Sequence, residues 1–234
     1  MLLSVVKTTD NKEENMQRAQ VTQEILQKCI ELALEEDYYP ESLITMAPNP
    51  WAEILRTSAF YDASILIMGV KELNIHVLNN QVSDLALRTR TDLALLRSPE
   101  GWRVKQCKKV LIPVSGGIQN SEMRARFLNR LYSQHPLEIT YLSVQSPEGT
   151  SRYLMRNLTN LIKDECPYSP EIRIEYEVNV ASTIQAISKE FDLVVMGLQE
   201  IKPGQPMFSE MICDIVNHIE SPFILLAQHS HRGH

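Results

Sequence analysis

Two apolar runs of strand length stand out along the chain, at residues 63–69 and 191–197. Each follows a segment with helical spacing of apolar residues and ends at a glycine, as strands buried on both faces of a parallel sheet do. A polar stretch, a helical segment and a shorter apolar run come next, the last at residues 93–96 and 223–226. The matching order and spacing predict an internal duplication of one α/β unit.

Strands and helices alternate throughout, which predicts a doubly wound, mainly parallel sheet in each of two repeats. We assign the first repeat to residues 1–98, a linker to 99–108, the second repeat to 109–228 and a tail to 229–234. The pattern predicts strands at residues 2–6, 43–46, 63–69, 93–96, 109–114, 139–144, 172–178, 191–197 and 223–226, and helices at 15–36, 51–60, 82–89, 121–133, 150–164 and 181–190.

The first repeat has no counterpart of residues 109–133, the strand and helix that open the second repeat. In a sheet of this type the opening strand is central, so the first repeat lacks its middle strand. Either the polypeptide is a fragment of a longer one, or another segment fills the position. We expect a fragment, because an empty central position would leave two rows of backbone donors and acceptors unpaired.

Composition narrows the function classes. The chain has 234 residues, 44% of them hydrophobic, which is enough for two cores. A net charge of −6 without a basic run argues against a nucleic-acid surface. The longest apolar runs are far shorter than the roughly 18 residues of a membrane span, and the first residues do not resemble a signal peptide. We therefore expect a cytoplasmic protein with no direct membrane insertion.

Cysteine and histidine residues form no recognisable site in the sequence. The cysteines show neither Cys-x-x-Cys spacing nor matching histidines, so we expect idle thiols and no metal at Cys29, Cys107, Cys166 and Cys213. No nucleophile or carboxylate partner is evident beside His76, His135 and His218, and the tail holds His229, His231 and His234. The chain is predicted not to be an enzyme.

Three stretches together resemble the universal stress protein superfamily, here in a tandem and degenerate form. They are the opening strand at residues 110–116, the strand at 192–197 with its twin at 64–69, and the closing strands at 92–96 and 222–226. The resemblance covers nearly the whole chain. It implies a flavodoxin-like three-layer fold and, as in many members, a dimer built edge to edge through the closing strands.

Nucleotide-binding members of that superfamily carry a loop of the form Gly, two residues, Gly, nine residues, Gly, then Ser or Thr. Such glycines let backbone amides approach the phosphates at a helix N-terminus. Gly69 and Gly197 match the first glycine, but Glu72 and Glu200 stand at the second. A carboxylate there would repel a triphosphate.

The remaining positions of that motif also depart from the pattern. The third glycine is replaced by Val82 and Glu210, and Ser83 alone fits the terminal hydroxyl. Ser115 stands where the opening strand of nucleotide-binding members ends in an acidic residue. We therefore expect no nucleotide and no other cofactor.

One further stretch, Ser115-Gly116-Gly117, is similar to the loop of PP-loop ATP pyrophosphatases. That loop continues with one residue, Asp and Ser, whereas Gln119 takes the Asp position here and one extra residue precedes Ser121. We interpret the stretch as a glycine-permitted turn rather than an active site.

A tandem fold with degenerate loops is similar to the cytoplasmic carboxy-terminal domain of prokaryotic cation–chloride cotransporters and amino-acid permease-type carriers. The resemblance implies a non-catalytic regulatory or assembly domain of a membrane transporter. Its partners would be the membrane domain of the same polypeptide and a second copy, bound through a closing-strand edge. The alternative is a free-standing cytosolic universal stress protein that senses a nucleotide through an atypical loop.

Overall fold

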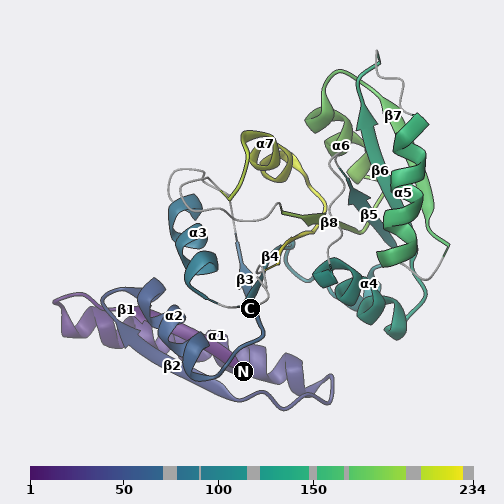
Figure 1. The fold of residues 1–234 in the computed structure, drawn as a ribbon. Coiled ribbons are helices and arrows are strands. Elements are labelled where there is room, and N and C mark those ends of the chain that lie inside the picture. The colour runs from purple at the N-terminus through teal and green to yellow at the C-terminus, as the bar shows by residue number, and fades with distance from the viewer. Residues whose placement is uncertain are drawn as a thin grey trace. The chain divides into compact units, whose positions relative to one another are not determined.

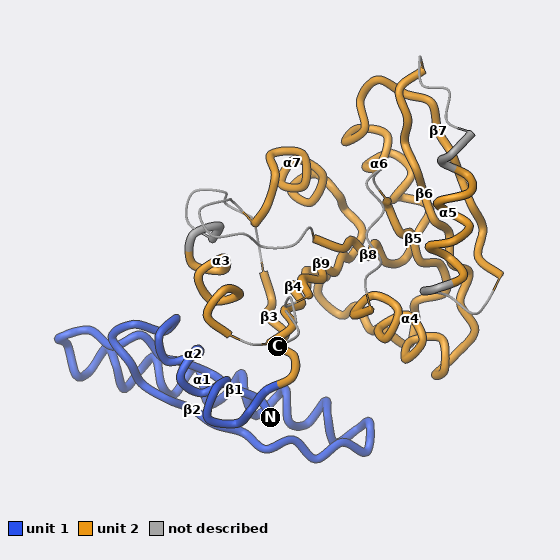
Figure 2. The backbone as a smooth tube through the Cα atoms, in the orientation of Figure 1, with its two compact units in different colours: residues 1–63 blue, residues 64–234 orange. Residues whose placement is uncertain are grey.

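The computed structural model describes residues 1–70, 78–89, 91–114, 122–147, 152–165, 169–198 and 207–228. The chain forms two compact bodies, Met1–Ala63 and Ser64–His234, called here the N-terminal body and the main body (Figure 2). Each body is described by itself.

The N-terminal body is a two-stranded parallel sheet with two helices packed on it. Strand β1 (Leu2–Lys7) leads into helix α1 (Lys12–Leu34), and strand β2 (Ser42–Ala47) leads into helix α2 (Pro50–Phe60). Asn11 caps α1 by accepting hydrogen bonds from the first-turn amides, and Asn49 does the same for α2. The Asn11 cap explains why α1 begins before the predicted residue 15.

The main body is built on a seven-stranded sheet with helices around it (Figure 1). Its elements are β3 (Ile65–Gly69), α3 (Leu78–Arg88), β4 (Asp92–Arg97), the 3₁₀ turn η1 (Val104–Gln106), β5 (Lys109–Pro113), α4 (Glu122–Gln134), β6 (Glu138–Gln145), α5 (Arg152–Glu165), β7 (Glu171–Tyr176), α6 (Val180–Ser188), β8 (Leu193–Gly197), α7 (Glu210–His218) and β9 (Phe223–Ala227).

The strand order is β3-β4-β9-β8-β5-β6-β7, and every neighbouring pair is parallel except β4 and β9. The pairs β3–β4 and β8–β9 have the same register, with Gly69 opposite Leu96 and Gly197 opposite Leu226. The antiparallel β4–β9 pair places Leu95 opposite Leu225 at its centre. Pairing between the closing strands β4 and β9 thus joins the β3–β4 pair to the other strands of the sheet.

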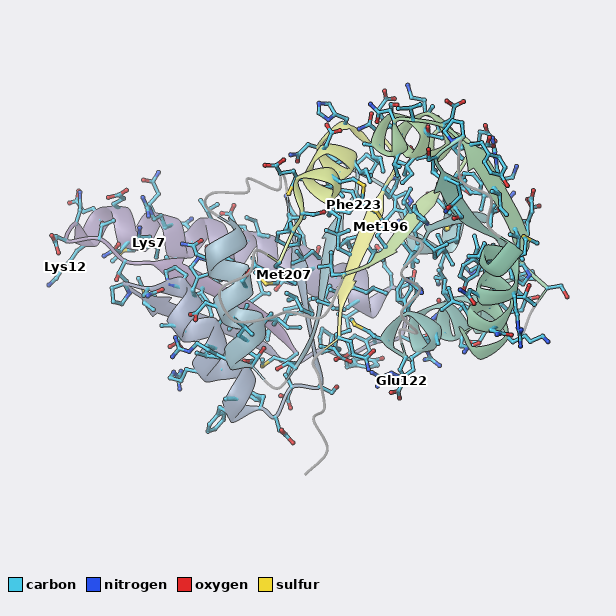
Figure 3. The ribbon with its side chains drawn as sticks, turned by 45° about the horizontal axis from the view of Figure 1, so that its top comes forward. Lys7, Lys12, Glu122, Met196, Met207 and Phe223 are labelled. Carbon is cyan, nitrogen blue, oxygen red and sulfur yellow. The ribbon has the colours of Figure 1, made fainter. Side chains whose placement is uncertain are left out.

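The main core lies where α4 covers the sheet. Met123 and Leu128 of α4 pack in one cluster with Val110 and Ile112 of β5 and Ile224 of β9. Successive side chains of a strand point to opposite faces of the sheet. The residues that alternate with these core residues along each strand therefore belong to the other face. Met196 and Phe223 of the adjacent strands β8 and β9 are such residues, and both are buried (Figure 3).

The α/β fold class with a mainly parallel sheet is confirmed. Among the described residues, β1 pairs only with β2, and β3 pairs only with β4. The sequence predicted one sheet for each repeat. The structure differs, because β3 and β4 belong to the same sheet as the strands of the second repeat.

The boundary between the compact bodies also differs from the predicted linker at residues 99–108. The chain divides after Ala63, because β4 is hydrogen-bonded to β9 and stays with the main body. Within the predicted linker, Cys107 is fully buried and Trp102 packs against the main core.

Self-association through a closing-strand edge is contradicted by the sheet order. Strand β4 lies between β3 and β9, and β9 lies between β4 and β8. Because both edges of both closing strands already carry backbone hydrogen bonds, neither strand can add a partner.

Candidate functional site

The carboxyl ends of parallel strands form the usual binding edge of a sheet of this kind. Gly69 ends β3 and Gly197 ends β8, as the sequence predicted. The structure places the two glycines in equivalent positions, each opposite a leucine of the following closing strand. The surroundings of the two glycines nevertheless differ.

Arg124 of α4 lies directly over Gly197. A Cβ atom on Gly197 would stand 2.8 Å from Nη1 of Arg124, so the glycine permits this close approach. The arginine is buried, with 5% of its surface exposed. Its guanidinium group therefore occupies space at the end of β8 that a ligand would need in order to reach the Gly197 backbone.

Gly69 is open by comparison. A Cβ atom on Gly69 would meet no atom of the described residues within 4 Å. Within the described part of the first repeat, no helix equivalent to α4 packs over β3. The two strand ends thus share a backbone geometry and differ in what covers them.

The N-terminus of α7 is capped by its own residues. The Ser209 hydroxyl accepts a hydrogen bond of 3.2 Å from the Ile212 amide, and Glu210 lies in the first turn. Glu210 stands at the third glycine position of the nucleotide motif. Its carboxylate already complements the positive end of the helix, which is the place where a phosphate would bind.

Ser83 does not stand at a helix N-terminus. Helix α3 begins at Leu78, so Ser83 lies in its second turn, where it is buried. Its hydroxyl therefore cannot serve as the terminal hydroxyl of a phosphate loop. The other predicted motif residues, Glu72, Ser115, Gly116 and Glu200, lie outside the described residues.

The Asp192 side chain, just before β8, is hydrogen-bonded to the backbone at the start of the neighbouring strand β5. Its Oδ2 atom accepts hydrogen bonds from the backbone amides of Lys108, at 2.8 Å, and Lys109, at 2.9 Å. In the sequence alignment of the repeats, Ser64 stands at the position of Asp192. Among the described strands, the acidic residue is thus present before β8, which pairs with the opening strand β5, and absent before β3, which pairs with β4 alone. Sequence reasoning missed this contact, although an aspartate just before a buried strand was a visible signal.

Two of the described cysteines are buried thiols. Cys107 and Cys213 are buried and Cys29 is exposed. Burial, followed by the negative charge of Asp192, raises the pKa of the Cys107 thiol to about 12, and burial also raises the pKa of Cys213. Both buried thiols therefore stay protonated at neutral pH.

The described histidines make local contacts. Nε2 of His135 lies 2.7 Å from the carbonyl oxygen of Cys107. The sequence indicated no carboxylate beside His218, but Nδ1 of His218 lies 3.0 Å from Oδ1 of Asp214 on the exposed side of α7. Within the described ranges, no group of three or more His, Cys, Asp or Glu side chains is placed to hold a metal ion.

The sequence matches no family model and none of the curated proteins with which it was compared. Solved structures do match. A universal stress protein from Archaeoglobus fulgidus DSM 4304 superposes on 100% of this chain and 88% of its own, with a TM-score of 0.67 and 14% identity. The fold is that of universal stress proteins. A second match is the cytoplasmic domain of a prokaryotic cation chloride cotransporter, which covers 99% of this chain and 85% of its own at a TM-score of 0.60 and 12% identity.

This example of the universal-stress-protein fold has one strand-end glycine, Gly197, covered by a buried arginine and another, Gly69, left open. The two glycines lie at opposite edges of the sheet, because β3 and β8 run in opposite directions. None of the helices in the described ranges is long and apolar enough to cross a membrane. The described groups near Gly197 include the buried guanidinium of Arg124.

Proposed function

We propose that this chain is a non-catalytic regulatory or assembly domain of a membrane transporter, of the cation–chloride cotransporter or amino-acid permease type. The observation that carries the proposal is the Arg124 side chain over Gly197. A nucleotide could contact the end of β8 only if this buried side chain moved away. The capped N-terminus of α7 supports the same conclusion.

The transporter context is supported by the likeness to the cytoplasmic domain of a cation chloride cotransporter. In this proposal the domain acts in the cytoplasm, joined to a membrane domain of the same polypeptide, and self-associates through a surface other than its closing strands. Translating the genomic DNA upstream of the Met1 codon tests the context. A series of apolar segments of about 20 residues in the same frame is expected. An in-frame stop codon immediately upstream would contradict the transporter assignment.

Calorimetry with ATP and ADP on the purified chain tests the absence of a nucleotide, and light scattering on the same sample gives the mass. No binding heat and a dimeric mass are expected. A monomeric mass at high protein concentration would contradict self-association.

One observation favours the alternative, a free-standing nucleotide sensor. Arg124 is a cation beside a strand-end glycine, and cations at such positions bind phosphate groups in other proteins. Micromolar ATP binding to the native chain that is lost in Arg124→Ala would establish this alternative and overturn the proposal.

A further inference from the structure

Strand β3 is far more exposed than its equivalent strand β8. Ile65 is 44% exposed and Ile67 65% exposed, whereas Leu193 and Val195, at the same positions of β8, are both fully buried. The two strands have the same length, the same apolar character and the same register with their closing strands. Strand β8 therefore serves as an internal control for β3. The difference in exposure between the two strands must come from the elements that surround each of them.

Two elements that cover β8 have no equivalent at β3 within the described part of the chain. Strand β5 pairs with β8 along its other edge, with Val110 opposite Leu193 and Leu111 opposite Val194. Helix α4 follows β5 and packs over the same face. Strand β3 pairs with β4 alone among the described strands.

The opposite edge of the same sheet is protected in the way expected of a true edge. Strand β7 carries Glu171, Arg173 and Glu175, and Arg173 forms ion pairs of 2.7 Å with Glu175 and 3.2 Å with Glu190. Charged side chains discourage the addition of another strand. Strand β3 has the sequence Ile-Leu-Ile-Met-Gly and no such charge. Its edge is therefore suited to pairing.

An apolar groove of about 430 Å³ lies over the exposed face of β3. Its floor is formed by Ile65 and Ile67 together with alternate residues of β4 and β9, and one wall is formed by Met123 and Phe127 of α4. Arg126 also lines the groove. The groove thus runs beside α4, over a sheet face that is covered by a helix at β8.

We propose that the β3 edge and this groove are a docking site for a strand–helix segment of a separate partner polypeptide. The partner's apolar strand pairs parallel to β3, as β5 pairs with β8, and its amphipathic helix lies in the groove with apolar side chains on Ile65 and Ile67. Residues 109–134 of this chain, which form β5 and α4, are the template for that occupant. The proposal does not depend on the transporter assignment.

The groove also predicts the charge of the partner helix. Arg126 and Arg130 of α4 line it, with Arg126 paired to Asp92. The antiparallel β4–β9 pair relates the two halves by a local twofold axis, so the docked helix faces α4 with the side that corresponds to Arg126 and Arg130. Like charges would repel there, so the partner helix carries acidic residues on this side.

A second copy of this chain fits the site less well. Two β3 strands could pair edge to edge, but such a pair brings no helix over Ile65 and Ile67, because α4 of each copy already packs on its own sheet. A strand–helix segment satisfies the free edge and covers the apolar face at the same time.

The test uses the full chain with Cys29→Ser and Ile67→Cys, and measures the rate of thiol labelling at residue 67 by peptide mass mapping. The probe is a synthetic peptide of residues 108–134, in its native sequence and with Arg126→Glu and Arg130→Glu. A scrambled peptide serves as the control ligand. Val178→Cys, at a site 86% exposed in the connection that follows β7, serves as the control position.

We expect the Glu-substituted peptide to slow labelling at residue 67 by at least about tenfold and the native peptide to do so more weakly, with no change at residue 178. Backbone hydrogen exchange of β3 in the otherwise native chain should slow with the same peptide. No protection by either peptide would overturn the proposal, as would equal protection by the scrambled peptide. Protection that appears without peptide as the protein concentration rises would assign the site to a second copy and also overturn it.

Discussion

Arg126 of α4 and Asp92 at the start of β4 form an ion pair, with Nη2 and Oδ2 2.7 Å apart. The Asp92 side chain is nearly buried, whereas most of the Arg126 side chain is exposed. The pair connects a helix of the second repeat to a strand of the first, along the wall of the apolar groove.

The two partners of this pair should respond unequally to truncation. Arg126→Ala removes the charge partner of a buried carboxylate and should lower the free energy of unfolding by about 1–3 kcal/mol. Asp92→Ala leaves an arginine that water can solvate, and this loss should be smaller, about 1 kcal/mol. Urea unfolding of the single and double variants gives the coupling energy, and a coupling energy near zero would show that the pair contributes nothing.

The two strand-end glycines offer a matched pair of substitutions. Gly197→Ala places a methyl group against the Arg124 guanidinium, which must shift, so we expect a loss of about 1 kcal/mol in stability. Gly69→Ala meets open space and should be neutral or slightly stabilising, because alanine restricts the unfolded chain. Thermal unfolding of both variants checks the contrast. Equal effects at the two sites would mean that Arg124 does not constrain Gly197.

The Asp192 carboxylate should stabilise the start of β5 through its two hydrogen bonds to backbone amides. Asp192→Ala leaves the Lys108 and Lys109 amides without their acceptor, and we expect a loss of about 1–3 kcal/mol. Amide exchange at Lys109 should speed up by more than elsewhere in the sheet. Asp214→Ala, on the exposed side of α7, is the control and should change stability little. Unchanged exchange at Lys109 would contradict a role for Asp192 at this strand.

Alkaline pH should destabilise the protein through Cys107. The folded thiol has a pKa of about 12, while an unfolded cysteine has a pKa of about 8.5. Between these values the unfolded chain has lost the proton that the folded chain keeps, so stability falls as pH rises, by up to about 1.4 kcal/mol per pH unit. Below pH of about 8 this contribution is constant.

Urea unfolding at several pH values checks this prediction, with Cys107→Ala as the reference. Other groups also titrate in this range, so the informative quantity is the difference between the two slopes of stability against pH. The variant should lose stability less steeply than the native chain. Parallel slopes would show that the Cys107 thiol titrates normally in the folded protein.

Much of the fold follows from local patterns in the sequence. The apolar runs before Gly69 and Gly197 predicted β3 and β8, and strand–helix alternation predicted the mainly parallel sheet. The same pattern failed to distinguish the environments of the two strands. An apolar run shows that a strand is suited to burial, whereas its actual burial depends on neighbours that lie elsewhere in the chain.

The antiparallel pairing of β4 with β9 and the position of Arg124 over Gly197 could not be predicted from the sequence. Both closing strands are apolar throughout, so nothing in their pattern favours an antiparallel register with Leu95 opposite Leu225. Arg124 stands on a helix among polar residues, where an arginine usually faces water. Its position over Gly197 depends on tertiary packing.

The β4–β9 pair has a consequence for how the two halves can diverge. In a symmetric homodimer, one gene encodes both sides of the junction, and every substitution appears on both. Here Leu95 and Leu225 are encoded separately, so each side can change alone. Each side of the junction can therefore acquire a different task without a matching change on the other side.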